Sequence, residues 1–216
     1  PDAVHPLRTA ESPAMIAVAM DAAFCFYYRD NFDYLRAAGA ELCFFSSLSD
    51  VLPQADAYYF GGGYPEVHAA ALENSPCKHG LTRAEDAGLP ICGECGGLMW
   101  LARSITTADG VVHPMAGLLD ADAVMEKRFV ALNYVIGTNT ADSAVFPAGL
   151  SFRGHEFHYS RTVPDADVRY LFMLKRGTGI ANGRDGICAG SVLGGYTHMY
   201  FGNAMATAFC RKLERI

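Results

Sequence analysis

Short apolar runs alternate with segments of helical periodicity through the first half of the chain. The runs at 15–20, 41–45, 57–60 and 90–92 have the length of buried parallel strands. Between and after them the pattern predicts helices over 32–38, 67–72, 81–87 and 98–102. Asn31 is the expected N-cap of the first helix, and Gly39 is expected to end it. This order predicts an α/β domain with a mainly parallel sheet flanked by helices.

The second half of the chain has a different pattern. Short strands are expected over 129–136, 150–157, 168–174 and 187–192, with few helix signals between them. They predict antiparallel additions to the same sheet or a layer that covers it. A turn through His198 and a helix over 203–213 close the chain. With no internal repeat, a single elaborated domain is expected.

The amino-acid composition and net charge limit which classes of molecule the chain is expected to bind. The chain has 216 residues, 51% of them hydrophobic, and a net charge of −6, which is typical of a globular domain. No long basic cluster occurs, so neither nucleic acid nor an anionic membrane is expected as a partner. Seven cysteines without a signal peptide favour reduced thiols and a cytoplasmic location. Residues 1–14 are expected to be a linker from a longer polypeptide, and 15–216 the functional domain.

The segment 91–100 contains the strongest candidate for a nucleophile. Cys95 lies among glycines between an apolar strand and a helix, which is the arrangement of a nucleophile elbow. The helix N-terminus is expected to lower the pKa of the thiol, and the Gly96 amide to donate to an oxyanion. Cys92 and Cys95 also have the spacing of a redox pair or half a zinc site. No metal site is expected because no second paired motif follows, but a dithiol or a structural thiol stays open.

A thiol nucleophile needs a base, which is usually a histidine distant in sequence. His198 is the best-placed candidate because it follows a strand and precedes the last helix, where the active sites of α/β proteins gather. A structural histidine is the alternative. His155 and His158 lie within an expected strand.

Gly61, Gly62 and Gly63 directly follow an expected strand. They lack the Gly-Lys-Ser/Thr that a phosphate-binding loop requires. Three successive glycines can instead direct main-chain N–H groups at an oxyanion. A flexible turn is the alternative.

Five segments occur together in a familiar order: 16–28, 61–66, 94–99, 153–160 and 196–200. From about residue 15 onward the chain resembles the C-terminal glutaminase domains of the cobyrinic acid a,c-diamide synthases. These belong to the class I, triad-type glutamine amidotransferases. The resemblance implies a flavodoxin-like α/β fold, with Cys95 as the nucleophile that forms a γ-glutamyl thioester and His198 as its base.

The same resemblance implies further site residues. The turn 61–63 and the amide of Gly96 would form the oxyanion hole. The strand carrying His155, Glu156 and Phe157 would line the pocket for L-glutamine, partly through backbone groups. Many class I glutaminases have a Glu two residues after the histidine, but this chain has Tyr200. A Cys–His dyad is therefore expected, with the imidazole oriented by a backbone carbonyl or by Glu156.

The resemblance also implies partners. Ammonia would pass to an N-terminal synthetase domain, absent from this chain, that uses ATP and Mg²⁺ to amidate the a and c carboxylates of a corrinoid. No cofactor is expected in the glutaminase domain, and a homo-oligomer is compatible with it. The alternatives are the glutaminase domain of a nickel-sirohydrochlorin a,c-diamide synthase or of a cobyric acid synthase. A catalytically silent module for binding or assembly is a third.

Overall fold

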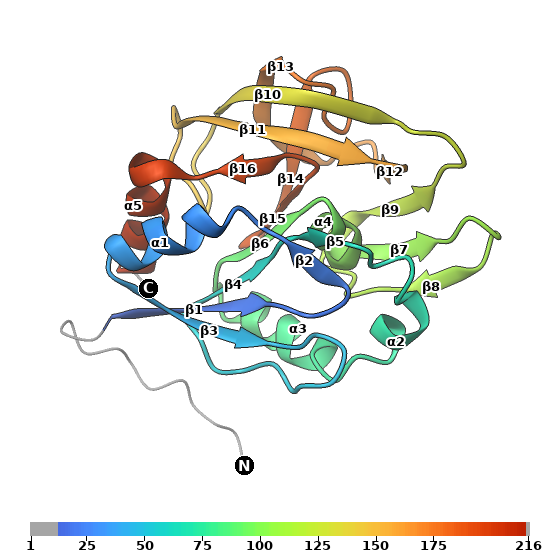
Figure 1. Cartoon of the computed structure of the whole chain (residues 1–216), viewed down its shortest axis with the longest axis horizontal. Helices are drawn as coiled ribbons and strands as arrows, with labels where there is room; N and C mark the ends of the chain where they lie inside the picture. Colours follow the sequence, from blue (N-terminus) through green and yellow to red (C-terminus); the bar gives the residue numbers. More distant parts are fainter. Residues whose placement is uncertain (1–12, 215–216) are drawn as a thin grey trace.

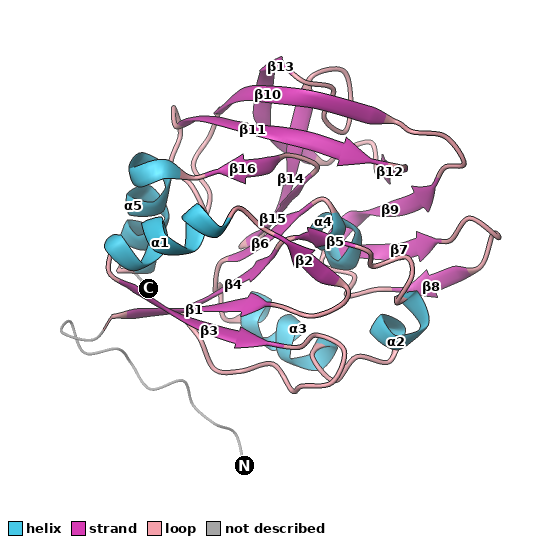
Figure 2. Ribbon diagram, in the orientation of Figure 1, coloured by secondary structure: helices cyan, strands magenta, loops and turns pink. Residues whose placement is uncertain are grey.

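A computed structural model describes residues 13–214, and its centre is a ten-stranded mixed sheet (Figures 1 and 2). The strand order is β16-β11-β10-β13-β14-β15-β6-β4-β1-β3. The segment from β15 to β3 is parallel, and the remaining pairs are antiparallel. The strands are β1 (Ala14–Ala19), β3 (Ala40–Phe45), β4 (Ala57–Phe60), β6 (Ile91–Glu94), β10 (Ala131–Asn139), β11 (Ser151–His158), β13 (Arg169–Arg176), β14 (Arg184–Ala189), β15 (Val192–Gly195) and β16 (His198–Tyr200).

Two smaller sheets and five helices complete the described part of the chain. The helices are α1 (Arg29–Ala37), α2 (Ala69–Glu73), α3 (Lys78–Asp86), α4 (Gly96–Leu101) and α5 (Gly202–Leu213). The four-stranded sheet contains β12 (Ser160–Pro164), β9 (Leu119–Met125), β7 (Ala102–Thr106) and β8 (Val112–Pro114). The two-stranded sheet contains β2 (Phe24–Phe26) and β5 (Gly62–Gly63). The predicted α/β class is thus confirmed, and the antiparallel additions extend the same sheet.

Successive residues of the parallel strands are buried on opposite faces of the sheet, as the two-residue repeat of a strand requires. In β4, Tyr58 and Phe60 belong to one core cluster, whereas Ala57 and Tyr59 belong to the other. Helices α2, α3 and α4 contribute to the first cluster, and α1 and α5 contribute to the second. Figure 1 shows α1 and α5 side by side at one end of the sheet.

Three local predictions were wrong. Asn31 does not cap α1, because the helix starts at Arg29 and the Asn31 side chain is fully buried within it. The expected strand 187–192 is two strands, β14 and β15, which a tight turn at Gly190 (φ +52°) separates. The expected helix 98–102 starts at Gly96 and ends at Leu101, where the chain enters β7 directly.

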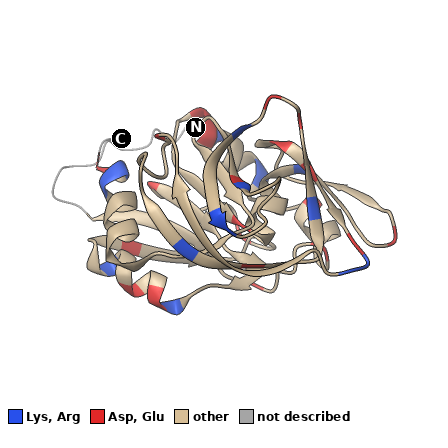
Figure 3. Cartoon of the chain, turned by 90° about the horizontal axis from the view of Figure 1, so that it is seen from above, with Lys and Arg blue, Asp and Glu red and all other residues tan. Residues whose placement is uncertain are grey.

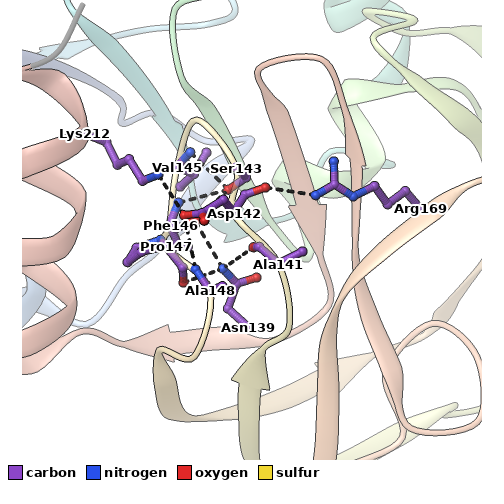
Figure 4. Close-up of polar contacts among 10 residues, drawn as sticks. All are labelled: Asn139, Ala141, Asp142, Ser143, Val145, Phe146, Pro147, Ala148, Arg169 and Lys212. Atoms are coloured by element: carbon purple, nitrogen blue, oxygen red, sulfur yellow. Dashed lines mark hydrogen bonds and ion pairs between the residues drawn. The ribbon is translucent and has the colours of Figure 1, made fainter.

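The loop between β10 and β11 is held by polar contacts (Figure 4). Arg169 of β13 donates to the carbonyl oxygen of Asp142 over 2.9 Å, and Lys212 of α5 forms an ion pair of 3.2 Å with the Asp142 carboxylate. These contacts join the antiparallel half of the sheet to the last helix. The buried Asn139 amide also donates to three carbonyl oxygens of the loop, those of Ala141, Phe146 and Pro147.

Acidic and basic positions are interspersed along the ribbon in Figure 3. Among residues 13–214, no helix has the length and apolar character needed to cross a bilayer.

Candidate active site

Cys95 lies at a sharp turn between β6 and α4. Its backbone has φ +50° and ψ −96°, a conformation that residues with a side chain rarely adopt. The glycines nearby are required by close packing. A Cβ atom on Gly97 would lie 2.3 Å from the carbonyl oxygen of Phe60, and one on Gly93 would lie 2.7 Å from the Gly97 backbone. The turn therefore has the strained geometry of a nucleophile elbow.

The thiol of Cys95 is buried, with 7% of the residue exposed. Burial raises its pKa to about 12, and the charge of nearby Glu66 is the next largest cause. The backbone N–H of Gly96, at the start of α4, lowers this pKa as expected, but the desolvation of the buried thiol outweighs it, so the net shift is upward. The Sγ atom donates to the carbonyl oxygen of Phe157 over 3.8 Å. At pH 7 the Cys95 thiol is thus protonated.

His198 begins β16, which pairs with β11 so that His155 lies directly opposite. The two imidazole rings stack with centroids 4.7 Å apart and planes 9° apart. Burial, together with the smaller effects of the neighbouring His155 and His158, lowers the pKa of His198 to about 3. The imidazole is therefore neutral at pH 7 and has a lone pair that can accept a proton.

The segment 61–63 lies against both the elbow and the imidazole. A Cβ atom on Gly62 would lie 2.2 Å from Cε1 of His198, and one on Gly96 would lie 3.1 Å from the Gly63 nitrogen. The turn that carries Cys95 and the imidazole of His198 therefore both pack against the segment 61–63. The thiol and the ring nevertheless form no hydrogen bond to each other within residues 13–214. Pairs of this kind often tighten only when substrate binds.

The backbone N–H groups expected to bind an oxyanion are not all free to do so. The N–H of Gly61 donates to the Tyr27 hydroxyl over 2.8 Å, so it is already engaged. Gly62 and Gly63 form β5 and pair with β2. The role of Gly62, Gly63 and Gly96 as oxyanion donors stays a prediction.

Strand β11 places its three expected site residues on different sides. His155 faces His198, and the carbonyl of Phe157 faces Cys95. Glu156 points to the opposite face, where its carboxylate accepts hydrogen bonds of 2.5–2.9 Å. Glu156 therefore does not orient His198, contrary to one of the two expectations. The donors to Glu156 are Asn133 Nδ2, Thr178 N and Gly179 N.

The other expectation, a backbone carbonyl, was also wrong. In the part of the chain that the structure describes, neither ring nitrogen of His198 has a hydrogen-bond partner, and the ring is held by stacking on His155 and packing against Gly62. Tyr200, at the position where many class I enzymes have Glu, donates to Asp30 Oδ2 over 3.1 Å and so binds α1.

Three buried polar residues that the sequence analysis missed hold the histidine strand. Glu94, directly before Cys95, accepts a hydrogen bond from the Met199 N–H at 3.1 Å. Asn31 donates to the Met199 carbonyl over 2.7 Å and accepts from the Phe201 N–H at 2.9 Å. Asp185 accepts from the N–H groups of the two residues before His198. Only Glu94 carried a sequence signal, as a lone charge in a run of apolar and small residues, because Asn31 and Asp185 each follow a charged residue.

An open cavity of about 270 Å³ lies beside His198. Tyr28 closes one side, and a hydrogen bond of 2.6 Å joins its hydroxyl to Nδ1 of His155. The sequence analysis did not single out the segment 25–28 as part of a site. The cavity is lined by Cys25, Phe26, Tyr27, Tyr28, His155 and His198.

The two cysteines of the Cys92–Cys95 pair belong to different sides of the sheet. Cys92 is buried in the cluster beneath α1 and α5, whereas Cys95 belongs to the cluster beneath α2, α3 and α4. All seven thiols are free. This separation does not suit a dithiol redox pair, whose two sulfur atoms must meet.

Comparison with known proteins places this geometry in a family. Residues 15–206 match the CobB/CobQ-like glutamine amidotransferase domain. The cobyrinate a,c-diamide synthase of Methanosarcina barkeri is 44% identical over 201 residues, which cover 86% of this chain and 40% of that protein. The enzyme of the same name from Halobacterium salinarum is 43% identical over 185 residues, covering 86% of this chain and 42% of that protein. The chain thus spans about two fifths of the length of these relatives.

Solved structures support the fold. PurLQS from Thermotoga maritima has a chain that aligns with a TM-score of 0.63 at 16% identity, covering 94% of this chain and 96% of that one. A crystal structure of a glutamine amidotransferase aligns with a TM-score of 0.63 at 18% identity, covering 93% and 99%. Together with the domain match over residues 15–206, these comparisons show that the chain belongs to the CobB/CobQ-like glutamine amidotransferase domain family.

Proposed function

We propose that this domain hydrolyses L-glutamine and supplies the ammonia to a cobyrinate a,c-diamide synthase. The observation that carries the proposal is the strained turn at Cys95, which holds a thiol beside the segment 61–63 and within the same site as a neutral imidazole. The relatives that bear this enzyme name support the choice of acceptor.

The reaction starts from two neutral groups. His198 takes the Sγ proton of Cys95 as the sulfur attacks the side-chain amide carbon of glutamine. The carbonyl oxygen becomes an oxyanion, for which the amides of Gly62, Gly63 and Gly96 are the proposed donors. The C–N bond then breaks, and the imidazolium returns its proton to the departing ammonia. Water hydrolyses the remaining γ-glutamyl thioester to glutamate and restores the thiol.

Amidation itself would take place outside this chain. The turn 61–63 lacks the sequence of a phosphate-binding loop, so we place the ATP and Mg²⁺ site in the synthetase part of the longer protein. There the a and c carboxylates of the corrinoid would be activated and attacked by the ammonia. L-glutamine, the synthetase part and the corrinoid are thus the proposed partners.

The test separates ammonia supply from ammonia use in the longer protein. Cys95→Ser is expected to abolish glutamine-dependent amidation of cobyrinic acid while preserving amidation from ammonium chloride. His198→Asn should give the same separation. Cys92→Ser is the matched control and should keep most of both activities. A parallel loss of both activities in Cys95→Ser would show that Cys95 is structural. Covalent labelling of Cys95 by a diazo-ketone analogue of glutamine provides a second readout.

A further inference from the structure

One face of the antiparallel half of the sheet is apolar and exposed. Leu132, Tyr134 and Ile136 alternate along β10 on this face, with exposed fractions of 65%, 72% and 40%. Phe157 of β11 lies directly opposite Leu132, and Met173 of β13 is 52% exposed. We call these residues the outer face. Monomeric proteins rarely leave so many neighbouring large apolar side chains in water.

The outer face ends in an aromatic cluster. The ring of Phe157 lies 5.3 Å from that of Phe129 and 5.9 Å from that of Tyr159, and all three residues are 39–45% exposed. At the other end, Arg176 lies over the Tyr134 ring at 5.7 Å, and Arg153 is the register partner of Ile136. The face is therefore an apolar strip with a basic margin, which fits a partner with an apolar patch and acidic side chains beside it.

The outer face is continuous with the candidate active site. Tyr134 lies directly opposite His155, whose ring stacks on His198. Phe157 contributes its ring to the outer face, while its carbonyl accepts from Cys95. A protein that covers this strip also borders the cavity beside His198.

We infer that the outer face is the docking surface for the synthetase part of the longer protein. This inference rests on the proposed function. The match covers 40% of the Methanosarcina barkeri relative, so most of that protein lies outside it and could supply the partner surface. Ammonia that escapes into water is protonated and ceases to be a nucleophile, so its consumer must lie against the site that releases it.

The test uses the longer protein with Leu132→Lys, which puts a charge on the outer face beside Phe157 and leaves Cys95 and His198 unchanged. The corrinoid amide formed per glutamine hydrolysed is expected to fall about tenfold, the size of a strong interface residue. Amidation from ammonium chloride should stay at the level of the unmodified protein. Val112→Lys, at a 59% exposed position of β8, is the matched control and should leave the ratio unchanged.

The outcomes distinguish the two proposals. If Leu132→Lys and Val112→Lys give the same ratio, the docking surface is wrong even though glutamine hydrolysis persists. If Cys95 fails to react with the glutamine analogue in the unmodified protein, the proposed function fails first. A second copy of the chain is the rival occupant. It would be indicated if the 216-residue chain sediments as a dimer that Leu132→Lys dissociates, with the ratio unchanged.

Discussion

The thiol of Cys95 and the imidazole of His198 start the reaction without charge. Burial raises the pKa of one and lowers the pKa of the other, so proton transfer between them at rest is unfavourable. Many cysteine enzymes instead hold a preformed thiolate and imidazolium pair. Under the proposed function, the proton would move from Cys95 to His198 only as the substrate binds.

The protonation state of Cys95 can be measured by alkylation. Because the thiol pKa is about 12, the rate of its reaction with iodoacetamide should rise about tenfold per pH unit from pH 7 to 9. Mass spectrometry of the Cys95 peptide separates this reaction from that of the exposed Cys25. A rate that is already constant above pH 6 would instead indicate a thiolate paired with imidazolium.

Glu94 should make stability depend on pH. Burial raises its pKa to about 8, so between pH 6.5 and 8 the folded chain holds a proton that the unfolded chain has released. The free energy of unfolding should therefore fall as pH rises through this window, by up to about 1.4 kcal/mol per pH unit. Glu94→Gln keeps an oxygen to accept the Met199 N–H and should flatten this slope. Urea unfolding of both proteins at four pH values measures this dependence. If the free energy of unfolding changed with pH equally in the unmodified protein and in Glu94→Gln, Glu94 would not be its cause.

At the scale of elements, the three-residue strand β16 depends on its neighbours for position. Asn31 bonds to the main chain on both sides of Tyr200, and Glu94 bonds to Met199. A strand of this length has few ladder bonds of its own, so buried side chains from α1 and β6 fix where His198 stands. The position of the His198 imidazole is thus fixed jointly by α1, β6 and β16.

Asn31→Ala tests this dependence. The change leaves the Met199 carbonyl and the Phe201 N–H buried without a partner, at a cost of about 1–3 kcal/mol in the free energy of unfolding. Glutamine hydrolysis should fall by more than the loss of folded protein explains, because β16 loses its anchor to α1. Asp33→Ala, an exposed position of the same helix, is the control and should change neither quantity measurably. Equal activity per folded molecule in both variants would assign Asn31 to stability alone.

The sequence predicted the elements of the parallel half better than those of the antiparallel half. Buried parallel strands are continuous apolar runs, so β1 and β4 were visible as blocks, and the edge strand β3 was visible because it is also mostly apolar. Strands β2, β7 and β12 have only three to five residues, too few for a clear pattern, whereas the alternation of β9 was overlooked. Asn31 was misassigned because its side-chain preference for helix starts is local, whereas its actual partners lie more than 160 residues away.

The candidate site was predicted in part. The elbow at Cys95 follows from local glycines, which sequence displays directly. The stacking of His155 on His198 and the displacement of Glu156 to the other face depend on the register of β11 with β16, which no local pattern specifies. The pKa of Cys95 likewise depends on burial, whose upward effect exceeds the lowering by the Gly96 N–H that the local helix argument predicts.

At the scale of the whole molecule, two core clusters share one sheet. Every parallel strand contributes to both, so neither cluster can lose its packing while the other keeps it. We therefore expect the described chain to unfold in one cooperative step, although it carries an extended antiparallel half.

The one tryptophan makes this expectation testable. Trp100 lies in the cluster beneath α2, α3 and α4, whereas Leu35 of α1 lies in the other. Leu35→Ala should cost about 2–5 kcal/mol, and the urea midpoint measured by Trp100 fluorescence should shift by the same amount as that measured by far-ultraviolet circular dichroism. Leu81→Ala, on the side of Trp100, is the matched variant. If the urea midpoint of Leu35→Ala measured by fluorescence differed from that measured by circular dichroism, the two core clusters would unfold independently.

Strand β11 has neighbours on both edges and side chains on both faces, and this has a mechanical consequence. On its Glu156 side the N–H groups of Thr178 and Gly179 bond to the carboxylate, and we expect these bonds to restrain the strand when a partner presses on Phe157 or on Leu132 of the neighbouring β10. In a close-packed structure such a load is passed on rather than absorbed. The imidazole of His155 and the carbonyl above Cys95 are the first groups to receive it. We therefore expect contact of another protein with Phe157 to change the surroundings of the Cys95 thiol through this strand.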